Sequence, residues 1–332
     1  MKLRHVLKTL AVAAGALTAA TAAQAQDQLR LMIGTPFATM AEIPWIVARE
    51  KGWAKEAGLA IEEKRVTGDA NAVRSLVAGD TDAAWTGSFS VISVVGKGTD
   101  VKAIFSWQPK TDYFVLAQKS AITKTADFAD KKVAISAPNS LSEAIVKLTL
   151  QAKGFDPAKA KMVAIGGNEK RLQALKTGQV EATILNVNYA EALTSDPNLH
   201  TLYVVPEILP DISFAWIIAT PKSAKDKAAA LQKFTELSLR GARFATENPK
   251  ETAAIYSKVS PEEDKGVVER SVAWFAKSKG FGTDGGVEMK ATAYTVELAM
   301  QLDKDQVKIP AEKLWDASFV DAALKKIGKY NK

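Results

Sequence analysis

The sequence predicts an α/β protein of two lobes, each a mostly parallel sheet with helices on both faces. Three observations predict this fold class. Strand-like apolar runs alternate with helical patterns up to about residue 220, which is typical of parallel sheets covered by helices. The segment SLVAGDTDAAWTGS at 75–88 resembles ALKTGQVEATILNV at 174–187, which indicates two similar halves. From residue 222 onward the chain is mostly helical.

The first half of the pattern predicts the element order β-α-β-α-β. Its expected elements are strands at 29–33, 59–66 and 82–85, and helices at 43–52 and 70–78. Pro44 suits the first turn of the earlier helix. Gly52 and Gly79 suit the two helix ends, because glycine readily adopts the left-handed conformation found there. The last strand leads into three small residues at 86–88.

The second half repeats this unit further along the chain. Apolar runs at 101–105 and 113–117 precede this unit. Its expected elements are strands at 132–136, 161–165 and 182–187 and a helix that begins after residue 140, and a long buried strand is expected afterwards at 212–220. Ser140 and Glu143 fit a capping box at the start of that helix. The strand-like stretches at 113–117 and 213–217 are the expected crossings between the lobes. We therefore expect residues 26–112 plus 219–332 in lobe 1 and residues 113–218 in an inserted lobe 2.

A constant offset of 99 residues relates the two halves. The residues that correspond at this offset are Leu76 and Leu175, Gly79 and Gly178, Asp82 and Glu181, and Ala83 and Ala182. In each case a helix end, a glycine, an acidic turn and a buried strand follow one another. The sequence therefore predicts that the chain builds a similar corner twice.

The first 25 residues have the pattern of a secretory signal peptide. A basic start is followed by an apolar run at 10–20 and by Ala23-Gln24-Ala25, a small-x-small cleavage site. We expect cleavage after Ala25 and a periplasmic location for the rest of the chain. The apolar run is too short to span a bilayer, and the lack of cysteine excludes disulfides and lipid attachment through a cysteine.

Composition excludes several classes of function. The chain has 44 Lys and Arg against 37 Asp and Glu, without runs of like charge, so we expect no nucleic-acid partner. Beyond residue 25 the only histidine is His200, in a polar stretch that we read as a loop. Neither a G-x-S-x-G elbow nor a glycine-rich phosphate loop occurs. We therefore expect no catalytic residue, no metal and no cofactor, and a binding protein in place of an enzyme.

Small polar residues follow the ends of the predicted strands in both halves. The ligand-binding candidates are Thr35, Phe37, Thr39, Thr86, Gly87, Ser88, Trp107, Asn139, Ser140, Ser142, Asn186, Asn188, Phe214 and Trp216. In open α/β sheets ligands bind beyond the carboxyl ends of the strands, where helix N-termini favour anions. We therefore expect a small anion in a cleft with one half in each lobe. The same residue types also serve as caps and turns, and the aromatic ones as packing residues.

Five segments carry a resemblance to the solute-binding proteins for nitrate, sulfonates and taurine. They are PWIVAREKGWAKEAGLAIE at 44–62, SLVAGDTDAAWTGS at 75–88, TADFADKKVAISAPNS at 125–140, RLQALKTGQVEATIL at 171–185 and LWDASFVDAA at 314–323. Together they span nearly the whole chain beyond residue 25, and the family's site carries over to the same loops that follow the strands. Glu181 stands where the family usually has aspartate. Thiamine-pyrimidine synthases share this fold, but this chain lacks their histidine and cysteine-rich motif.

The resemblance implies a periplasmic binding protein of type II-like fold, with the ligand cleft between the lobes. It also implies a monomer that serves an ABC importer, with a membrane permease and an ATPase subunit as partners. We expect such a protein to capture a small organic anion by hinge closure. That anion would be an alkyl or aryl sulfonate, a taurine-like compound or a carboxylate. A binding protein for a neutral pyrimidine or other heterocycle and an exported enzyme of this fold remain as alternatives, and a signalling receptor as a further partner.

Overall fold

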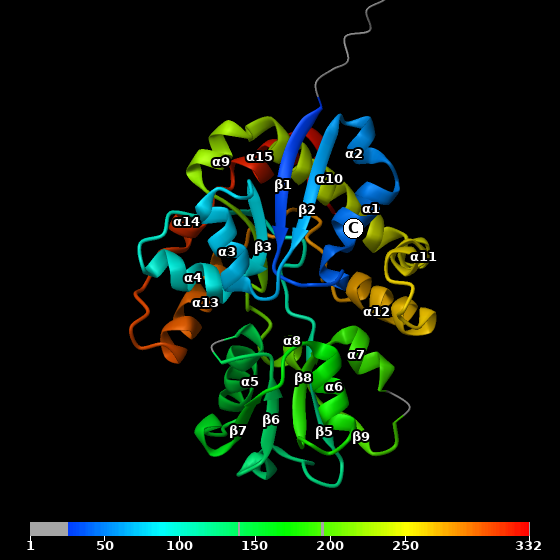
Figure 1. The fold of residues 1–332 in the computed structure, drawn as a ribbon, viewed down its shortest axis with the longest axis vertical. Coiled ribbons are helices and arrows are strands. Elements are labelled where there is room, and N and C mark those ends of the chain that lie inside the picture. Colours follow the sequence, from blue (N-terminus) through cyan, green and yellow to red (C-terminus); the bar gives the residue numbers. More distant parts are fainter. Residues whose placement is uncertain (1–25, 139, 194–195, 332) are drawn as a thin grey trace, which may run out of the picture.

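A computed structural model describes residues 26–138, 140–193 and 196–331 of the chain. These residues form two lobes that stand one above the other in Figure 1, and each lobe is built on a five-stranded sheet. Helices cover both faces of the sheets, so the predicted α/β class is confirmed. The signal peptide and the cleavage site that the sequence predicts lie outside the described residues.

Lobe 1 carries the sheet with the strand order β2-β1-β3-β10-β4. Its strands are β1 (Asp27–Ile33), β2 (Leu59–Arg65), β3 (Ala83–Gly87), β4 (Lys102–Phe105) and β10 (Ala215–Ala219). β1 is parallel to β2 and β3, whereas β10 is antiparallel to both β3 and β4. The sheet is therefore mostly parallel, with one reversed strand between β3 and β4.

Lobe 2 repeats this arrangement with the strand order β7-β6-β8-β5-β9. Its strands are β5 (Tyr113–Gln118), β6 (Lys132–Ile135), β7 (Lys161–Ala164), β8 (Ala182–Asn186) and β9 (Leu199–Val204). β6 is parallel to β7 and β8, and β5 is antiparallel to β8 and β9. In both lobes the reversed strand is the one that enters the sheet directly after the chain has crossed from the other lobe.

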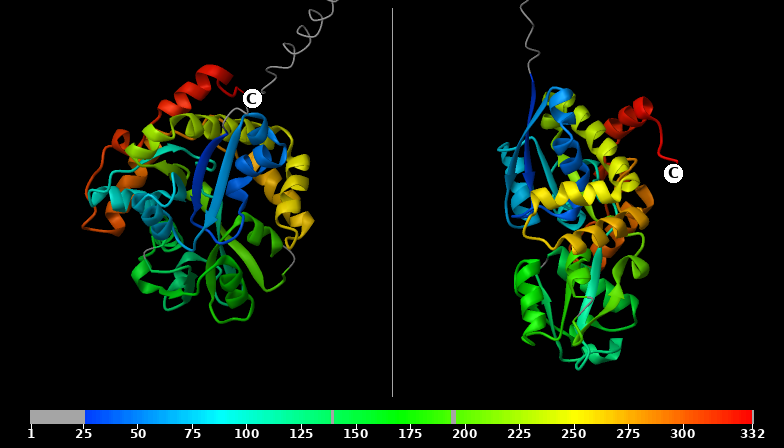
Figure 2. Two further views of the ribbon diagram at one scale, coloured as in Figure 1. Left: turned by 45° about the horizontal axis from the view of Figure 1, so that its top comes forward. Right: turned by 90° about the vertical axis from the view of Figure 1, so that its right-hand side faces the viewer.

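The helices of lobe 1 come from both ends of the chain. They are η1 (Met40–Glu42), α1 (Ile43–Glu50), α2 (Trp53–Glu56), α3 (Asp69–Ala78), α4 (Ser88–Gly96), α9 (Pro221–Asp226), α10 (Ala228–Glu247), α11 (Pro249–Val259), α12 (Lys265–Lys277), α13 (Met289–Leu302), α14 (Ala311–Leu314) and α15 (Ser318–Ile327). α3, α4 and α13 pack together over one face of the sheet, and α1 and α10 pack over the other. Figure 2 shows α15 on the outside of lobe 1, remote from lobe 2.

The helices of lobe 2 all lie between the two crossings. They are η2 (Thr125–Phe128), α5 (Leu141–Ala152), η3 (Pro157–Lys159), α6 (Asn168–Lys176), α7 (Val187–Ala192) and α8 (Val205–Ile208). α6 packs on β6 and β8, and α5 contacts α8. This lobe is therefore a continuous insertion into lobe 1.

Several local predictions are confirmed at the helix ends. Pro44 stands in the first turn of α1, and Gly52 follows that helix with a φ of 78°. Gly79 ends α3 with a φ of 82°, a conformation that glycine adopts without steric cost. Ser140 is the N-cap of α5, and its hydroxyl accepts the backbone N–H of Glu143.

The second boundary between the lobes differs from the prediction. The sequence assigned residues 215–218 to lobe 2, but β10 pairs with β3 and β4 and so belongs to lobe 1. The crossing itself lies just before β10, where Phe214 N donates to Pro109 O at 2.9 Å. A buried apolar strand has no feature in its own sequence that tells which of two sheets it enters, because both sheets would bury it equally well.

The placement of His200 also differs from the prediction. The sequence places it in a polar loop, whereas the structure places it in β9, with Nε2 2.8 Å from the carbonyl oxygen of Ile122. β9 is the edge strand of its sheet and pairs only with β5 there. Edge strands are half exposed and tolerate polar residues, which is why the apolar pattern is weak at this point.

The repeated corner that the sequence predicts is present in both lobes. Asp82 precedes β3 and accepts the backbone N–H of Arg30 at 2.8 Å. At the equivalent point of lobe 2, Glu181 precedes β8 and accepts the backbone N–H of Lys132, also at 2.8 Å. The acidic residue of each corner therefore ties the start of one central strand to its parallel neighbour.

Candidate ligand site between the lobes

The lobes approach each other where the carboxyl end of β3 faces the start of α5. A Cβ atom on Gly87 would lie 3.3 Å from Cδ2 of Leu141, so the backbone of lobe 1 nearly touches a side chain of lobe 2. α7 and α12 also lie next to each other across the junction (Figure 1). There Arg270 forms an ion pair with Glu191 at 2.9 Å. The loops that follow the strands of both sheets therefore converge on this junction.

Lobe 1 presents a carboxylate at the junction. Asp69 is the first residue of α3, and its Oδ1 accepts the backbone N–H of Gly87 at 2.8 Å and the hydroxyl of Thr86 at 3.1 Å. Oδ2 accepts no hydrogen bond from the described residues. It lies 3.0 Å from the position that a Cβ atom on Gly87 would take. The bonds to Oδ1 therefore hold the carboxylate in place, and Oδ2 can accept a hydrogen bond from a further partner.

The surroundings of Asp69 disfavour its charge. Burial raises the pKa of the carboxyl above its usual value, and the bonds from Gly87 and Thr86 only partly oppose this effect. No lysine or arginine of the described residues stabilises the carboxylate. A cation placed near Oδ2 would restore the preference for the ionised form.

Lobe 2 presents three hydroxyls around the start of α5. Ser142 Oγ lies 2.9 Å from the hydroxyl oxygens of both Ser136 and Ser140, and it accepts the backbone N–H of Ser136 at 2.9 Å. Each hydroxyl has one proton that it can turn toward a neighbour or a ligand. The positive end of the helix dipole at this helix start favours an anion.

Lobe 2 also contains a buried arginine that forms no ion pair with a described residue. Arg171, in α6, is only 3% exposed. Its Nη2 donates to the side-chain oxygen of Asn168, whereas Nε and Nη1 are buried without a hydrogen-bond partner among the described residues. No carboxylate of those residues forms an ion pair with it. An unpaired guanidinium in this position lacks the anion that such a group ordinarily requires.

Burial acts on the charge of Arg171 as it does on that of Asp69. It lowers the pKa of the guanidinium, and the nearby phenols of Tyr113 and Tyr189 and the carboxylate of Glu169 oppose this effect. Tyr113 begins β5, at the end of the strand that faces lobe 1, and its ring meets Phe214 of the second crossing edge-on at 5.5 Å. The guanidinium therefore lies at the junction end of lobe 2.

A second buried carboxylate at the junction is fully partnered, in contrast to Asp69. Asp112 lies in the first crossing and is 1% exposed. Its Oδ1 accepts the side-chain N–H groups of Gln108 at 2.9 Å and Asn186 at 2.8 Å, and its Oδ2 accepts the backbone N–H of Val187 at 3.4 Å. Burial raises its pKa and these bonds oppose the shift. Asp112 therefore holds Asn186 in place and has a structural role.

Half of the predicted site residues lie at the junction. They are Thr86 and Gly87 in lobe 1, Ser140, Ser142, Asn186 and Asn188 in lobe 2, and Phe214 in the second crossing. Asn139 lies outside the described residues. The other six residues lie inside lobe 1 or in the loop after β1.

The structure places Trp107 and Trp216 in the core, so the prediction that they line the site is wrong. Trp107 is 1% exposed and donates its indole N–H to Ser238 of α10. Trp216 is fully buried against Trp315, with ring centroids 5.2 Å apart. Side chains alternate along β10, and this alternation directs Trp216 to the face of the sheet that α13 covers.

Ser88 also differs from the prediction. Its hydroxyl is fully buried and donates to the backbone oxygen of Ser213 at 2.6 Å, so it holds the start of α4 to the second crossing. A hydroxyl with this partner has no proton left for a ligand. Ser88 therefore stabilises the second crossing.

The segment after β1 forms a loop with internal bonds. Thr35 donates to the backbone oxygen of Phe37, and Thr39 bonds to Glu42. The ring of Phe37 is 64% exposed. Among the described residues, the hydrogen bonds of these three predicted residues go to Glu42, to Arg65 and within the loop, and not to Asp69 or the hydroxyls of lobe 2.

Sequence reasoning missed Asp69 and Arg171. Asp69 precedes the predicted helix 70–78 and has the residue type of an ordinary cap. Arg171 has a clearer signal, because Ala174 and Leu175 follow it at the i+3 and i+4 spacing of a buried helix face. An arginine on that face indicates a buried charge that needs a partner.

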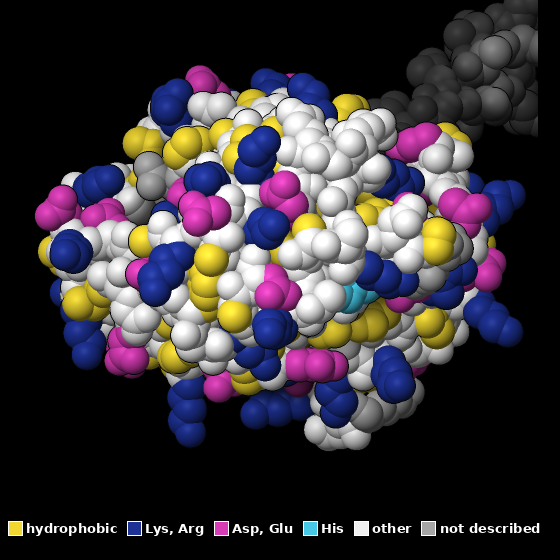
Figure 3. Space-filling view, turned by 90° about the horizontal axis from the view of Figure 1, so that it is seen from below, with side chains coloured by type: hydrophobic (Ala, Val, Ile, Leu, Met, Phe, Trp, Pro, Cys, Tyr) yellow, Lys and Arg dark blue, Asp and Glu magenta, His cyan; other side chains and the backbone are white. Residues whose placement is uncertain are grey.

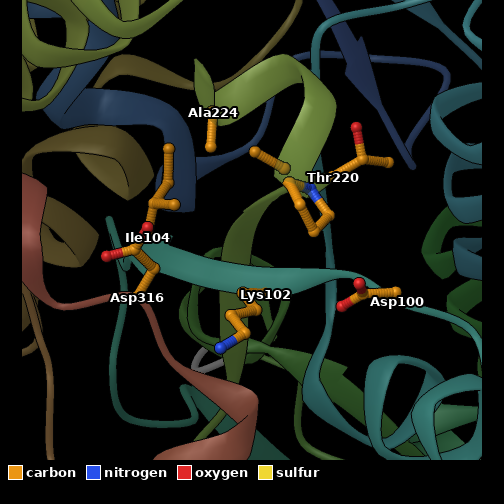
Figure 4. Close-up of a pocket in the computed structure, with 8 residues that line it drawn as sticks. Asp100, Lys102, Ile104, Thr220, Ala224 and Asp316 are labelled. Atoms are coloured by element: carbon orange, nitrogen blue, oxygen red, sulfur yellow. The ribbon is translucent and has the colours of Figure 1, made fainter.

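Two hollows in the surface of lobe 1 both lie at the ends of its strands that are remote from the junction. The first, of about 390 Å³, is lined by Asp100, Lys102, Thr220 and Asp316, among others (Figure 4). Lys102 begins β4, and Thr220 follows the antiparallel strand β10, so this hollow lies at the amino ends of the parallel strands. It contains none of the predicted site residues.

On the face of the molecule seen in Figure 3, basic and acidic side chains are interspersed. No described helix has the length and apolar character needed to cross a bilayer. Within the described residues no three His, Asp or Glu side chains gather to hold a metal ion.

The fold identifies the structural class of the protein. Two mixed five-stranded sheets with helices on both faces, joined by two crossings, are the architecture of periplasmic binding proteins. The chain belongs to the NMT1/THI5-like family, whose profile matches residues 40–252. No curated protein sequence matches the chain.

Solved structures similar to this chain come from several organisms. The periplasmic nitrate-binding protein NrtA from Synechocystis PCC 6803 is 15% identical with a TM-score of 0.73, and the match covers 91% of this chain and 89% of that one. For the aliphatic sulphonate binding protein SsuA from Escherichia coli the identity is 16%, the TM-score 0.69 and the coverage 88% and 93%. A ligand binding component of an ABC-type import system from Staphylococcus aureus, crystallised with zinc, has 13% identity, a TM-score of 0.73 and coverage of 90% and 99%.

Proposed function

We propose that the chain is the extracytoplasmic substrate-binding component of an ABC transporter and captures a small organic anion between its lobes. The ligand class is an alkyl or aryl sulfonate, a taurine-like compound or a carboxylate. The protein acts in the periplasm as a monomer, without catalysis and without a metal or cofactor. It delivers the ligand to a membrane permease and its ATPase subunit. Family membership and the similarity to sulfonate-, nitrate- and import-related binding proteins support this role.

The buried guanidinium of Arg171 carries the proposal. It is 3% exposed, and two of its nitrogen atoms have no partner among the described residues. A sulfonate or carboxylate between the lobes would pair with it and would also meet the hydroxyls at the start of α5. Charge-assisted hydrogen bonds of this kind are stronger than neutral ones, and more so where water is excluded.

The positions of the polar groups support binding by hinge closure. Asp69 belongs to lobe 1 and Arg171 to lobe 2, so a ligand can contact both only when the lobes are close together. Such a ligand shifts the population toward the closed arrangement, because it gains contacts that the open one lacks. The two crossings, near Pro109 and Phe214, are the hinge segments.

The binding test compares the wild-type protein with the Arg171→Gln variant. Wild-type protein should be stabilised in a thermal-shift screen by one class among taurine, alkanesulfonates, aryl sulfonates, aromatic carboxylates and nitrate, and calorimetry then gives its Kd. Arg171→Gln should weaken that binding by about a hundredfold or more, because glutamine keeps hydrogen-bonding capacity but removes the charge. Arg74→Gln, an exposed change on α3, should leave Kd unaltered.

The opposite results would contradict the proposed function. Unchanged affinity in Arg171→Gln would show that the guanidinium does not bind the anion. A response to pyrimidines alone would favour the alternative ligand class, for which the free carboxylate oxygen of Asp69 is the supporting observation. Turnover of a bound compound would indicate an enzyme.

A further prediction concerns the ion pair between Arg270 of α12 and Glu191 of α7. Both side chains are partly exposed, so the pair contributes up to about 1 kcal/mol to the closed arrangement. Arg270→Gln should therefore weaken ligand binding by up to about fivefold without lowering Tm. Raising the salt concentration should weaken wild-type binding similarly and leave the variant nearly unchanged. An equal salt response in both proteins would contradict this role.

A further inference from the structure

The two corners at the junction are equivalent positions of the repeat. Asp69 and Asn168 are 99 residues apart in the sequence and are the first residues of α3 and α6. Each bonds to the last residue of a central strand. Asp69 accepts from the backbone of Gly87 at 2.8 Å, and Asn168 donates to the side chain of Asn186 at 2.8 Å. Gly87 and Asn186 are again 99 residues apart.

The two equivalent corners carry opposite charge. Lobe 1 has the carboxylate of Asp69, whereas the same position in lobe 2 is the neutral amide of Asn168. The arginine of lobe 2, Arg171, has Ala72 as its equivalent in α3. The repeat therefore offers an acceptor with a free oxygen on one side of the junction and a donor with two free nitrogens on the other.

Asp69 and Arg171 both lie around the junction between the lobes. Tyr113 pairs with Asn186, and Asn186 bonds to Asn168, the residue that accepts from Arg171. The ring of Tyr113 meets Phe214 at 5.5 Å, and the backbone oxygen of Phe214 accepts the N–H of Ser88, directly after Gly87. Gly87, which bonds to Asp69, nearly touches Leu141 of lobe 2. Among the described residues the two groups form no ion pair with each other or with another side chain.

We propose that the ligand is a small zwitterion whose anionic group pairs with Arg171 and whose ammonium or amidinium group pairs with Asp69. This inference rests on the proposed function and narrows its ligand class from organic anions to amino sulfonates or amino carboxylates. Each lobe binds one end of the molecule, and a ligand that lacks either charge leaves one buried group unpaired. Unpaired buried charges discriminate strongly against such ligands.

The test uses pairs of compounds that differ only in the amino group. Taurine is compared with ethanesulfonate, 3-aminopropanesulfonate with propanesulfonate, and 4-aminobutyrate with butyrate, by calorimetry on the mature protein. For at least one pair we expect the amino compound to bind about tenfold more tightly or better. The chain length that binds best reports the distance between the two charged groups.

Asp69→Asn supplies the matched variant. Asparagine keeps an oxygen for the N–H of Gly87, so the fold of the corner is retained. The variant should lose the preference for the amino member of the pair and bind the compound without the amino group as well as the wild type does, or better. Asp80→Asn, an exposed change in the same lobe, should keep the preference. Tm values of the ligand-free proteins verify that both variants fold.

The outcomes separate this inference from the proposed function. If both members of every pair bind equally, or the compound without the amino group binds better, the inference of a zwitterionic ligand is wrong. The proposed function as a receptor for an organic anion is then unaffected. If Asp69→Asn keeps the full preference for the amino compound, the cation has another partner and the inference is overturned. If no compound of the pairs binds and none of the wider anion screen does, the proposed function fails and this inference fails with it.

Discussion

Replacing Gly241 by alanine is expected to destabilise the protein by about 4 kcal/mol or more. Gly241 lies in α10 where this helix crosses α1, and an added Cβ atom would lie 1.8 Å from the carbonyl oxygen of Pro44. The clashing atom belongs to the backbone, so no change of rotamer can relieve the overlap. α10 would have to move away from α1 and expose part of the core between them. Denaturant unfolding of the mature protein measures the loss.

Gly266→Ala is the matched control for this substitution. Gly266 also lies in a helix, α12, but its added Cβ atom would meet only the side-chain ends of Asp264 and Arg270, at 3.2 and 3.3 Å. These side chains can move. Alanine is favoured over glycine in helices by up to about 1 kcal/mol, so this variant should be neutral or slightly stabilised. Similar stability in the two variants would show that α1 and α10 do not pack as closely as described.

Replacing Arg171 by methionine is expected to stabilise the ligand-free protein by about 1–3 kcal/mol while it abolishes ligand binding. Methionine fills a similar volume and removes a buried charge that two unpaired nitrogens leave uncompensated. The single hydrogen bond that is lost, to the side-chain oxygen of Asn168, offsets only part of this gain. The lowered pKa of the guanidinium indicates the same penalty, because burial disfavours its charged form. Thermal and denaturant unfolding without ligand, together with calorimetry, measure both effects.

Arg243→Met is the control for this result. Arg243 is also largely buried, but it donates to the backbone oxygen of Thr283 at 2.9 Å and pairs with Asp284 at 2.7 Å. Removing a partnered guanidinium leaves acceptors without a donor, so this variant should lose stability. If Arg171→Met lost as much stability as Arg243→Met, the guanidinium of Arg171 would be a structural group and not a ligand group.

The sequence predicts the elements of this fold well where residue type and backbone geometry are tightly linked. Gly52, Gly79 and Ser140 end or begin helices because their conformation or side chain suits those points. The repeat predicts two equivalent corners because the same pattern of apolar and acidic residues recurs. Such patterns act over short distances along the chain, so a single sequence contains them.

Features that depend on contacts between distant segments could not be predicted in the same way. The alternation of β10 directs Trp216 into the core, but the sequence does not tell which sheet face meets α13. Ser88 has the residue type of a ligand-binding group, and only the position of the second crossing shows that its proton is already used. Arg171 and Asp69 become a pair of opposite charges only when the two lobes meet.

The position of β10 in the sheet determines the order in which the lobes can form as the ribosome makes the chain. All five strands of lobe 2 lie between residues 113 and 204, so this lobe is complete once that stretch has emerged. β4 pairs in its sheet only with β10, and must wait for residues 215–219. The lobe that begins the chain is therefore the last to finish, and until then it presents the open edges of β3 and β4 to whatever assists or disturbs the nascent protein.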